Sequence, residues 1–163
     1  MESLRDGVFV QLGDGGHVIR AAVRLVAAVV LGAVLGYERE HEGKAAGMRT
    51  HMLVALGAAI FTLVPIETGM NVEDLSRVVQ GVVVGIGFLG GGTILHLSQE
   101  HRVKGLTSAA SIWVTAAIGM TIGAGFLWPA LLGVALAWVV LSTMHHCEAW
   151  LKGRNSSGPR PGV

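Results

Sequence analysis

Residues 18–54 read VIRAAVRLVAAVVLGAVLGYEREHEGKAAGMRTHMLV, a mainly apolar run that leads into a densely charged segment and then into a second apolar run. About 20 mainly apolar residues are needed for a helix to cross the hydrocarbon core of a bilayer. Ionisable side chains are costly near hydrocarbon unless they pair with one another or meet lipid headgroups. The stretch therefore predicts two membrane-spanning helices joined by a polar segment that is a candidate functional site.

The whole chain is more apolar than an average soluble domain. Of its 163 residues, 52% are hydrophobic and 14% are charged, and the mean hydropathy is +0.59. Soluble domains average about 25% charged residues, so the composition predicts an integral membrane protein with the lipid bilayer as its surroundings. A net charge of +1 without a clustered basic face excludes nucleic acid as a partner. The single cysteine, Cys147, excludes a disulfide within the chain.

The apolar runs predict an all-α polytopic membrane protein with five transmembrane helices, at residues 18–37, 48–66, 78–97, 107–123 and 128–144. We expect an N-terminal tail over 1–17, a transmembrane domain over 18–145 and a cytoplasmic, disordered tail over 146–163. Most of the twelve Lys and Arg residues lie on the inner side if the N-terminus is outside. The predicted topology is therefore an outer N-terminus and a cytoplasmic C-terminus.

Glycines are concentrated in the third predicted span, where small residues four apart would let two helices approach closely. We expect this face to pack against another helix, within the bundle or between the protomers of a homodimer; a role in lining a substrate path is the alternative. Three successive glycines at 90–92 also predict a kink or break. The predicted packing glycines are Gly81, Gly85, Gly87, Gly90 and Gly91.

The polar residues around the first turn support two interpretations. In the sharper one, Arg49 pairs with Glu38 or Glu40 in a buried network that joins the first two spans, and His51 is its pH-responsive member. In the other, residues 49–51 only reach toward the interface. The candidate polar network comprises Glu38, Arg39, Glu40, Arg49, Thr50, His51, Arg77, Lys104, Thr107 and Ser108.

The start of the fourth predicted span is a second polar position. Thr107 or Ser108 is expected to cap this helix, and its N-terminus could receive an anion, with Glu38 or Glu40 as a candidate. An ordinary cap beside a lysine that meets lipid phosphates is the alternative. At the opposite side of the membrane, Arg24 and Arg77 are expected to reach headgroups or to pair with acidic residues among Glu67, Glu73 and Asp74.

Four blocks in this order resemble the MgtC/SapB family of bacterial inner-membrane proteins. They are Glu38-Arg39-Glu40, AGMRTHML at 46–53, residues 77–95 with GIGFLG at 85–90, and GLTSAASIWVTAAIG at 105–119. The resemblance extends over residues from about 20 to 145. Gly81, Val84 and Lys104 depart from the family pattern, which usually has glutamine, serine and arginine there. Larger members carry a soluble C-terminal domain, for which this chain is expected to leave no room.

The resemblance implies a protein tied to magnesium limitation, acid stress or survival inside host cells, and thus to virulence. In the best-known members this role is attributed to inhibition of the proton-translocating ATP synthase. No spacing typical of a zinc protease, a nucleotide-binding loop or a serine nucleophile appears, so we expect no enzyme activity, cofactor or metal site.

We therefore expect a non-enzymatic protein that modulates ion or energy homeostasis by binding a membrane protein or a second copy of itself. The alternative is a small-ion or solute transporter or channel that works as a dimer. A continuous polar cavity would favour transport, whereas a dry bundle with an exposed glycine groove would favour binding. The polar path would use Gln80, Thr93, Thr107, Ser111 and Thr115.

Overall fold

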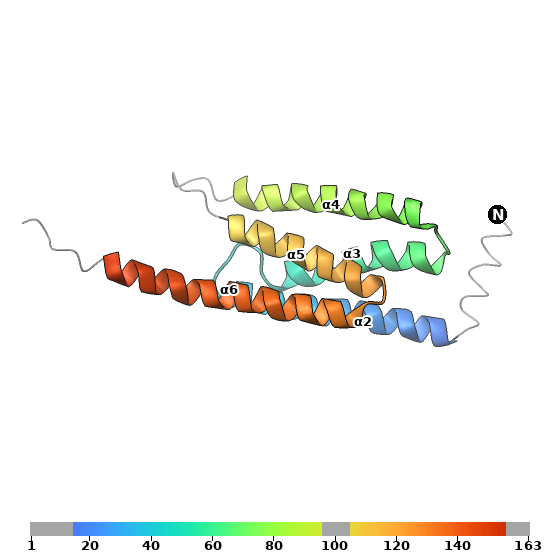
Figure 1. Ribbon diagram of the computed structural model, residues 1–163, viewed down its shortest axis with the longest axis horizontal. Coiled ribbons are helices and arrows are strands. Elements are labelled where there is room, and N and C mark those ends of the chain that lie inside the picture. Colours follow the sequence, from blue (N-terminus) through green and yellow to red (C-terminus); the bar gives the residue numbers. More distant parts are fainter. Residues whose placement is uncertain (1–14, 96–104, 156–163) are drawn as a thin grey trace, which may run out of the picture.

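The computed structural model describes residues 15–95 and 105–155, with side chains described within 15–94 and 105–143. These residues form five α-helices that run side by side along one long axis (Figure 1). The predicted all-α class is confirmed for this part of the chain. The helices are α2 (Gly15–His41), α3 (Met48–Glu67), α4 (Val72–Leu95), α5 (Leu106–Gly123) and α6 (Leu127–Asn155).

Within the described ranges, α2, α3, α4 and α5 are each long and apolar enough to cross a membrane. The apolar part of α6, Leu127–Thr143, is slightly shorter than these four spans. Large apolar side chains cover the outside of the bundle, with Phe88 85% and Trp128 82% exposed. Lipid accommodates such a surface, whereas a soluble protein rarely exposes it. The chain is therefore a membrane protein.

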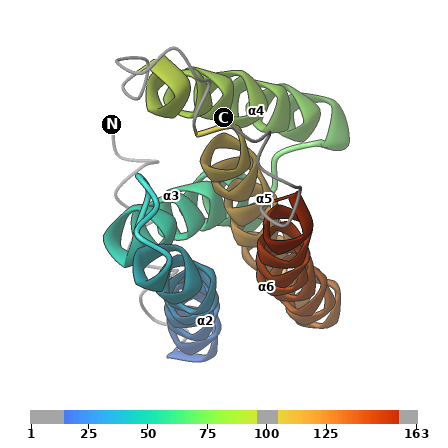
Figure 2. The ribbon, with the colours of Figure 1, turned by 90° about the vertical axis from the view of Figure 1, so that its left-hand side faces the viewer.

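Helix α5 lies at the centre of the bundle, as the view in Figure 2 shows. Among the five described helices it alone contacts all four others, and α3 packs most extensively against α2 and α5. Helix α4 lies at the edge and buries little of its surface. The bundle thus consists of a tight α2, α3 and α5 unit with α4 and α6 added to it.

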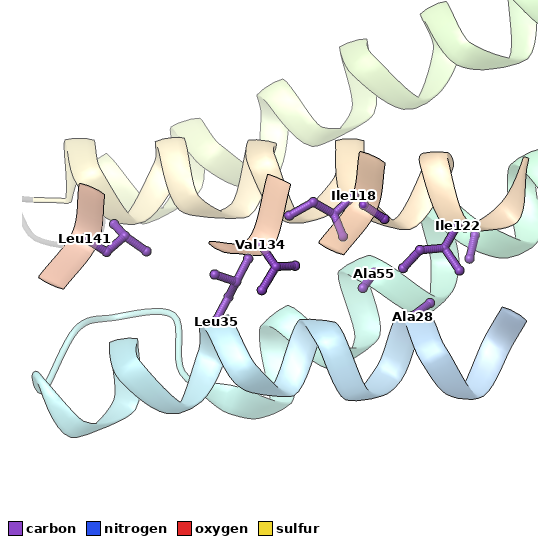
Figure 3. Packing of buried hydrophobic residues seen from close by; sticks show 9 residues of the cluster. Ala28, Leu35, Ala55, Ile118, Ile122, Val134 and Leu141 are labelled. Atoms are coloured by element: carbon purple, nitrogen blue, oxygen red, sulfur yellow. The ribbon is translucent and has the colours of Figure 1, made fainter. Parts of the chain in front are cut away.

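The apolar core consists of small and branched side chains. Ala28 and Leu35 from α2 meet Ala55 from α3, Ile118 from α5 and Val134 from α6, and their side chains point toward one another in Figure 3. Small residues at helix contacts allow the close backbone approach on which packing in membranes depends. This composition explains how an 18-residue helix such as α5 can be surrounded by four neighbours.

Two pairs of glycines, one on α2 and one on α5, let these helices pack closely against α3. The two glycines of each pair are four residues apart. A Cβ atom on Gly119 would lie 2.3 Å from the backbone oxygen of Ala55, and one on Gly123 would lie 2.4 Å from that of Ala59. On the other side, a Cβ atom on Gly32 or Gly36 of α2 would lie 2.7 Å or 2.5 Å from a backbone atom of α3. The sequence analysis missed these pairs, although their spacing of four was the available signal.

The glycines predicted to pack, in α4, behave differently. Gly81, Gly85, Gly87 and Gly91 have open space where a side chain would stand, whereas Gly90 is buried against Ala109 of α5. Within one chain, therefore, a single member of the predicted set contributes to close helix packing. Packing of this face between two chains stays a prediction.

The predicted break at 90–92 is wrong, because α4 is one helix from Val72 to Leu95, whereas a kink of the helix there stays a prediction. Each glycine costs about 1 kcal/mol of helix propensity relative to alanine. In hydrocarbon, however, a broken helix leaves backbone groups without hydrogen-bond partners, which costs several kcal/mol for each group. The membrane therefore keeps α4 continuous, and the Thr93 hydroxyl donates a further hydrogen bond to the Gly90 carbonyl at 2.7 Å.

Candidate functional site

The buried imidazole of His51 marks the meeting point of α2, α3 and α5. Gly36 leaves room for the His51 Cβ, and a Cβ on Gly32 would lie 2.7 Å from the His51 backbone oxygen. The α2 glycines therefore bring this turn of α3 against α2. His51 is 0% exposed, and its ring reaches toward α5.

Polar contacts connect the His51 ring to both its own helix and α5. Its Nδ1–H donates to the Gly47 carbonyl at 2.9 Å, since a carbonyl oxygen can only accept. The other ring nitrogen, Nε2, lies 3.2 Å from the Ser111 hydroxyl oxygen. Ser111 in turn donates to the Ser108 carbonyl at 2.8 Å. The buried chain of contacts thus runs from α3 into the first turns of α5.

A buried ion pair lies near the end of α2. The Arg39 Nε–H and Nη2–H groups donate to the two Glu38 carboxylate oxygens at 2.5 Å and 2.6 Å. The side chains of Arg39 and Glu38 are only 3% and 11% exposed. The predicted pairing of Arg49 with Glu38 or Glu40 is wrong, because Arg39 holds the Glu38 carboxylate, Glu40 accepts the Met48 N–H and Arg49 is exposed.

Glu40 has a different partner, the start of α3. Its carboxylate accepts the Met48 backbone N–H at 2.8 Å, and the cap position Gly47 provides no side-chain cap of its own. A carboxylate at this end of a helix is stabilised by the unpaired N–H groups and the helix dipole. Glu40 thus fixes the geometry of the α2–α3 turn, directly before His51.

Glu38 and Glu40 were candidates for an anion at the start of α5, and neither occupies that position. Glu38 is held by Arg39 and Glu40 by Met48. The cap of α5 is Gly105, whose φ of 97° lies in the left-handed region that glycine adopts readily, and it makes no side-chain cap bond. Thr107 and Ser108 follow the cap and do not form it.

Replacement of Glu40 by glutamine is expected to reduce the free energy of unfolding by about 1 kcal/mol, because the cap loses its charge. Thermal unfolding of the purified protein in detergent measures this change. Glu73→Gln is the matched control, an exposed glutamate in the first turn of α4, and we expect a smaller effect. An equal loss in the two variants would contradict the capping role of Glu40.

Among the other candidates, Arg77, Thr50 and Thr107 make none of the contacts described for the His51 ring. Arg77 is exposed and pairs with Asp74 at 3.6 Å, while Thr50 and Thr107 are also exposed. Lys104 lies outside the described residues. At the opposite end of the bundle, Arg24 lies 3.5 Å from Glu67 and donates to the Gly123 carbonyl at 3.4 Å.

An apolar groove of about 610 Å³ lies between α3 and α4. Gly81 and Gly85 form part of the α4 wall, so two of the glycines with open space face a hollow and not a helix. A second apolar hollow of about 350 Å³ lies between α5 and α6. In the described ranges no group of three or more His, Cys, Asp or Glu residues could hold a metal ion. The larger groove is lined by Leu53, Val54, Gly57, Ala58, Phe61, Val78, Gly81, Val82, Gly85, Ile86 and Leu89.

Comparison with known proteins finds several relatives that are similar to this chain in sequence. The chain is 41% identical to Protein SrpB of Synechococcus elongatus over 158 residues, covering 89% of this chain and 85% of that protein. It is 39% identical to the putative magnesium transporter YhiD of Escherichia coli over 140 residues, 82% of this chain and 64% of YhiD. It is 42% identical to Protein MgtC of Salmonella typhimurium over 103 residues, 63% of this chain and 43% of MgtC.

No solved structure matches the chain. The profile of the MgtC family matches residues 25–150, which include the glycine pairs, the His51 contacts and the groove between α3 and α4. The chain therefore belongs to the MgtC family.

Proposed function

We propose that this protein modulates magnesium and energy homeostasis by binding a transmembrane helix of another membrane protein in the groove between α3 and α4. The observation that carries the proposal is the groove itself, which combines a volume of about 610 Å³ with an apolar lining that includes three glycines, Gly57, Gly81 and Gly85. The proposal needs no catalytic step and no bound cofactor.

Open glycines on α4 favour a helix as the occupant. Gly81 and Gly85 are four residues apart and leave the backbone bare toward the groove. In lipid, helices associate by close packing and not by the hydrophobic effect, so a bare backbone strip is where a second helix gains most contact. Val78 and Ile86 flank this strip and provide walls for such a helix.

The relatives supply the biological setting of the proposal. One of them bears the name of a putative magnesium transporter, and the resemblance to the MgtC/SapB family implies a link between magnesium limitation and the proton-translocating ATP synthase. A membrane subunit of that enzyme is the first partner to test, and a second copy of this chain is the second. The chain spans 64% of YhiD and 43% of MgtC.

The topology that we propose has five crossings of the bacterial inner membrane, with α6 as the fifth. The distribution of lysine and arginine supports an N-terminus outside and a C-terminus in the cytoplasm. In this orientation the α2–α3 turn, with the ion pair of Glu38 and Arg39, lies at the cytoplasmic side.

The transport alternative receives less support from the geometry. A broken helix at 90–92 would have favoured transport, because it could line a path for an ion. Helix α4 is continuous there and does not provide this feature. Thr115 and Ser111, which a polar path would use, are buried and bonded to carbonyl groups of α5 itself. Both large hollows of the described residues are apolar.

A double substitution that fills the groove tests the proposal. We expect Gly81→Leu with Gly85→Leu to fold normally, since both positions are open, and to block a helix from entering the groove. With a photoreactive amino acid in place of Leu53, a groove residue, protein adducts formed in native membranes should fall about tenfold, a change of about 1.4 kcal/mol in binding.

Gly87→Leu is the matched control, because Gly87 is also open but does not line the groove. We expect the control to keep its adducts and the double variant to lose them. Equal adduct yields in the two variants, or adducts with lipid alone in the unmodified protein, would refute the groove as a partner site.

A further inference from the structure

We propose that His51 and Ser111 form a buried proton-binding site, and that the bound proton adds a hydrogen bond between α3 and α5. This inference is independent of the groove and of the partner that the groove binds. It rests on how many hydrogen atoms the His51 ring, the Ser111 hydroxyl and the Ser108 carbonyl need to form their hydrogen bonds, and on the burial of the site.

The contacts of the His51 ring determine the proton on Nδ1 but not whether Nε2 also carries one. Its Nδ1 must carry hydrogen, because the Gly47 carbonyl 2.9 Å away can only accept. A neutral imidazole then has a bare Nε2, which needs a donor. The available neighbour is the Ser111 hydroxyl at 3.2 Å, and this hydroxyl has a single hydrogen.

The Ser111 hydrogen has two competing acceptors. In the described geometry the hydroxyl donates to the Ser108 carbonyl at 2.8 Å, which turns an oxygen lone pair toward His51 Nε2. In that arrangement both ring contacts are hydrogen bonds only when Nε2 also carries hydrogen, that is, when the ring is an imidazolium. With a neutral ring, the hydroxyl must turn to Nε2 and the Ser108 carbonyl loses this bond.

One added proton therefore converts a shared hydrogen bond into two simultaneous ones. The proton binds to the Nε2 lone pair, Nε2–H donates to the Ser111 oxygen, and the hydroxyl hydrogen returns to the Ser108 carbonyl. The backbones need not move, because Gly32 and Gly36 already hold this turn of α3 against α2. A hydrogen bond to a charged group is stronger than a neutral one.

The charges around the ring come from α2. Glu38 and Arg39 form their ion pair there, and the Glu40 carboxylate lies at Gly47 and Met48, at the start of the turn that precedes His51. Helix α5 contains no Asp, Glu, Lys, Arg or His between Leu106 and Gly123. On α3 the nearest charge is the exposed Arg49. The charged groups that α2 contributes near this turn are thus one cation, Arg39, and two carboxylates, one of which is paired with that cation.

The experiment is ¹⁵N magnetic resonance of histidine-labelled, full-length protein in lipid nanodiscs between about pH 8 and pH 5, the range over which histidine usually changes charge. The spectrum of His51→Gln assigns the His51 ring signals. In the unmodified protein we expect Nδ1 to remain protonated throughout and Nε2 to gain its proton as the pH falls.

Ser111→Ala removes the acceptor for the new N–H group, and we expect the ratio of imidazolium to imidazole at a given acidic pH to fall about tenfold. Ser111→Cys keeps the branching of the side chain and replaces the hydroxyl by a larger thiol, a weaker hydrogen-bond partner, so its ratio should lie between those of the other two proteins. Thr62→Val is the matched control, since Thr62 is a buried hydroxyl that bonds only the Ala58 carbonyl of its own helix. This variant should titrate like the unmodified protein.

Two results would overturn the proposal. One is a His51 ring that keeps the same number of protons across the whole pH range. The other is a Ser111→Cys protein, folded as judged by its remaining histidine signals, in which His51 titrates as in the unmodified protein.

Discussion

Replacing Arg39 with methionine is expected to reduce the free energy of unfolding by about 3–5 kcal/mol, because it leaves the Glu38 carboxylate buried without its counter-charge. The Glu38 side chain is 11% exposed and its two oxygens accept hydrogen bonds from Arg39. The measurement is reversible unfolding in mixed micelles, followed by circular dichroism. The loss should be visible as a lower midpoint of denaturation.

Two further variants distinguish the loss of the Glu38–Arg39 ion pair from the loss of any positive charge in this region. The double variant Glu38→Met with Arg39→Met removes both charges and should recover most of the lost stability, since buried ion pairs are often replaceable by apolar residues. Arg49→Met removes an exposed charge from the same region and should change stability by less than about 1 kcal/mol. An Arg49 variant as unstable as the Arg39 variant would show that the wrong arginine has been assigned to Glu38.

Gly119→Ala is expected to cost about 3 kcal/mol or to prevent folding, because the added methyl group would overlap the Ala55 backbone. Its carbon would lie 2.3 Å from the Ala55 oxygen and 2.9 Å from the Ala55 Cα. Backbone atoms of two packed helices cannot rotate away as a side chain can, so α5 must move off α3. The yield and unfolding midpoint in detergent measure the effect.

Gly87→Ala is the matched control for this substitution. It is also a glycine inside a membrane helix, but no atom lies within 4 Å of the position of its Cβ. The control should be as stable as the unmodified protein or up to about 1 kcal/mol more stable, because alanine is the better helix former. Similar losses in the two variants would mean that α3 and α5 do not approach at Gly119 as described.

Much of the fold could be predicted from apolar run length alone. The starts of α3 and α5 lie within one residue of the predicted spans, because glycine precedes each run. The starts of α2 and α4 were less predictable. Helix α4 begins at Val72, six residues before the predicted span, because the Asn71 side chain accepts the Asp74 N–H and caps the helix within the acidic loop.

The candidate site was predicted in its location but not in its pairings. The sequence indicated a polar cluster at 38–51, and the structure places Glu38, Arg39, Glu40 and His51 there. Pairing depends on which side chains point inward after α2 and α3 cross, and this crossing is set by glycines at 32 and 36. Spacing along one helix cannot reveal a contact such as His51 with Ser111, which are 60 residues apart.

The measurement that tests the central claim most directly is ion flux through the purified protein in sealed liposomes. The claim is that the described bundle, with its buried hydroxyls and apolar hollows, binds a partner and does not conduct. We predict that proton, potassium and magnesium fluxes equal those of empty liposomes at every applied gradient. A sustained flux of any of these ions, abolished by Gly119→Leu but not by Gly87→Leu, would contradict the account.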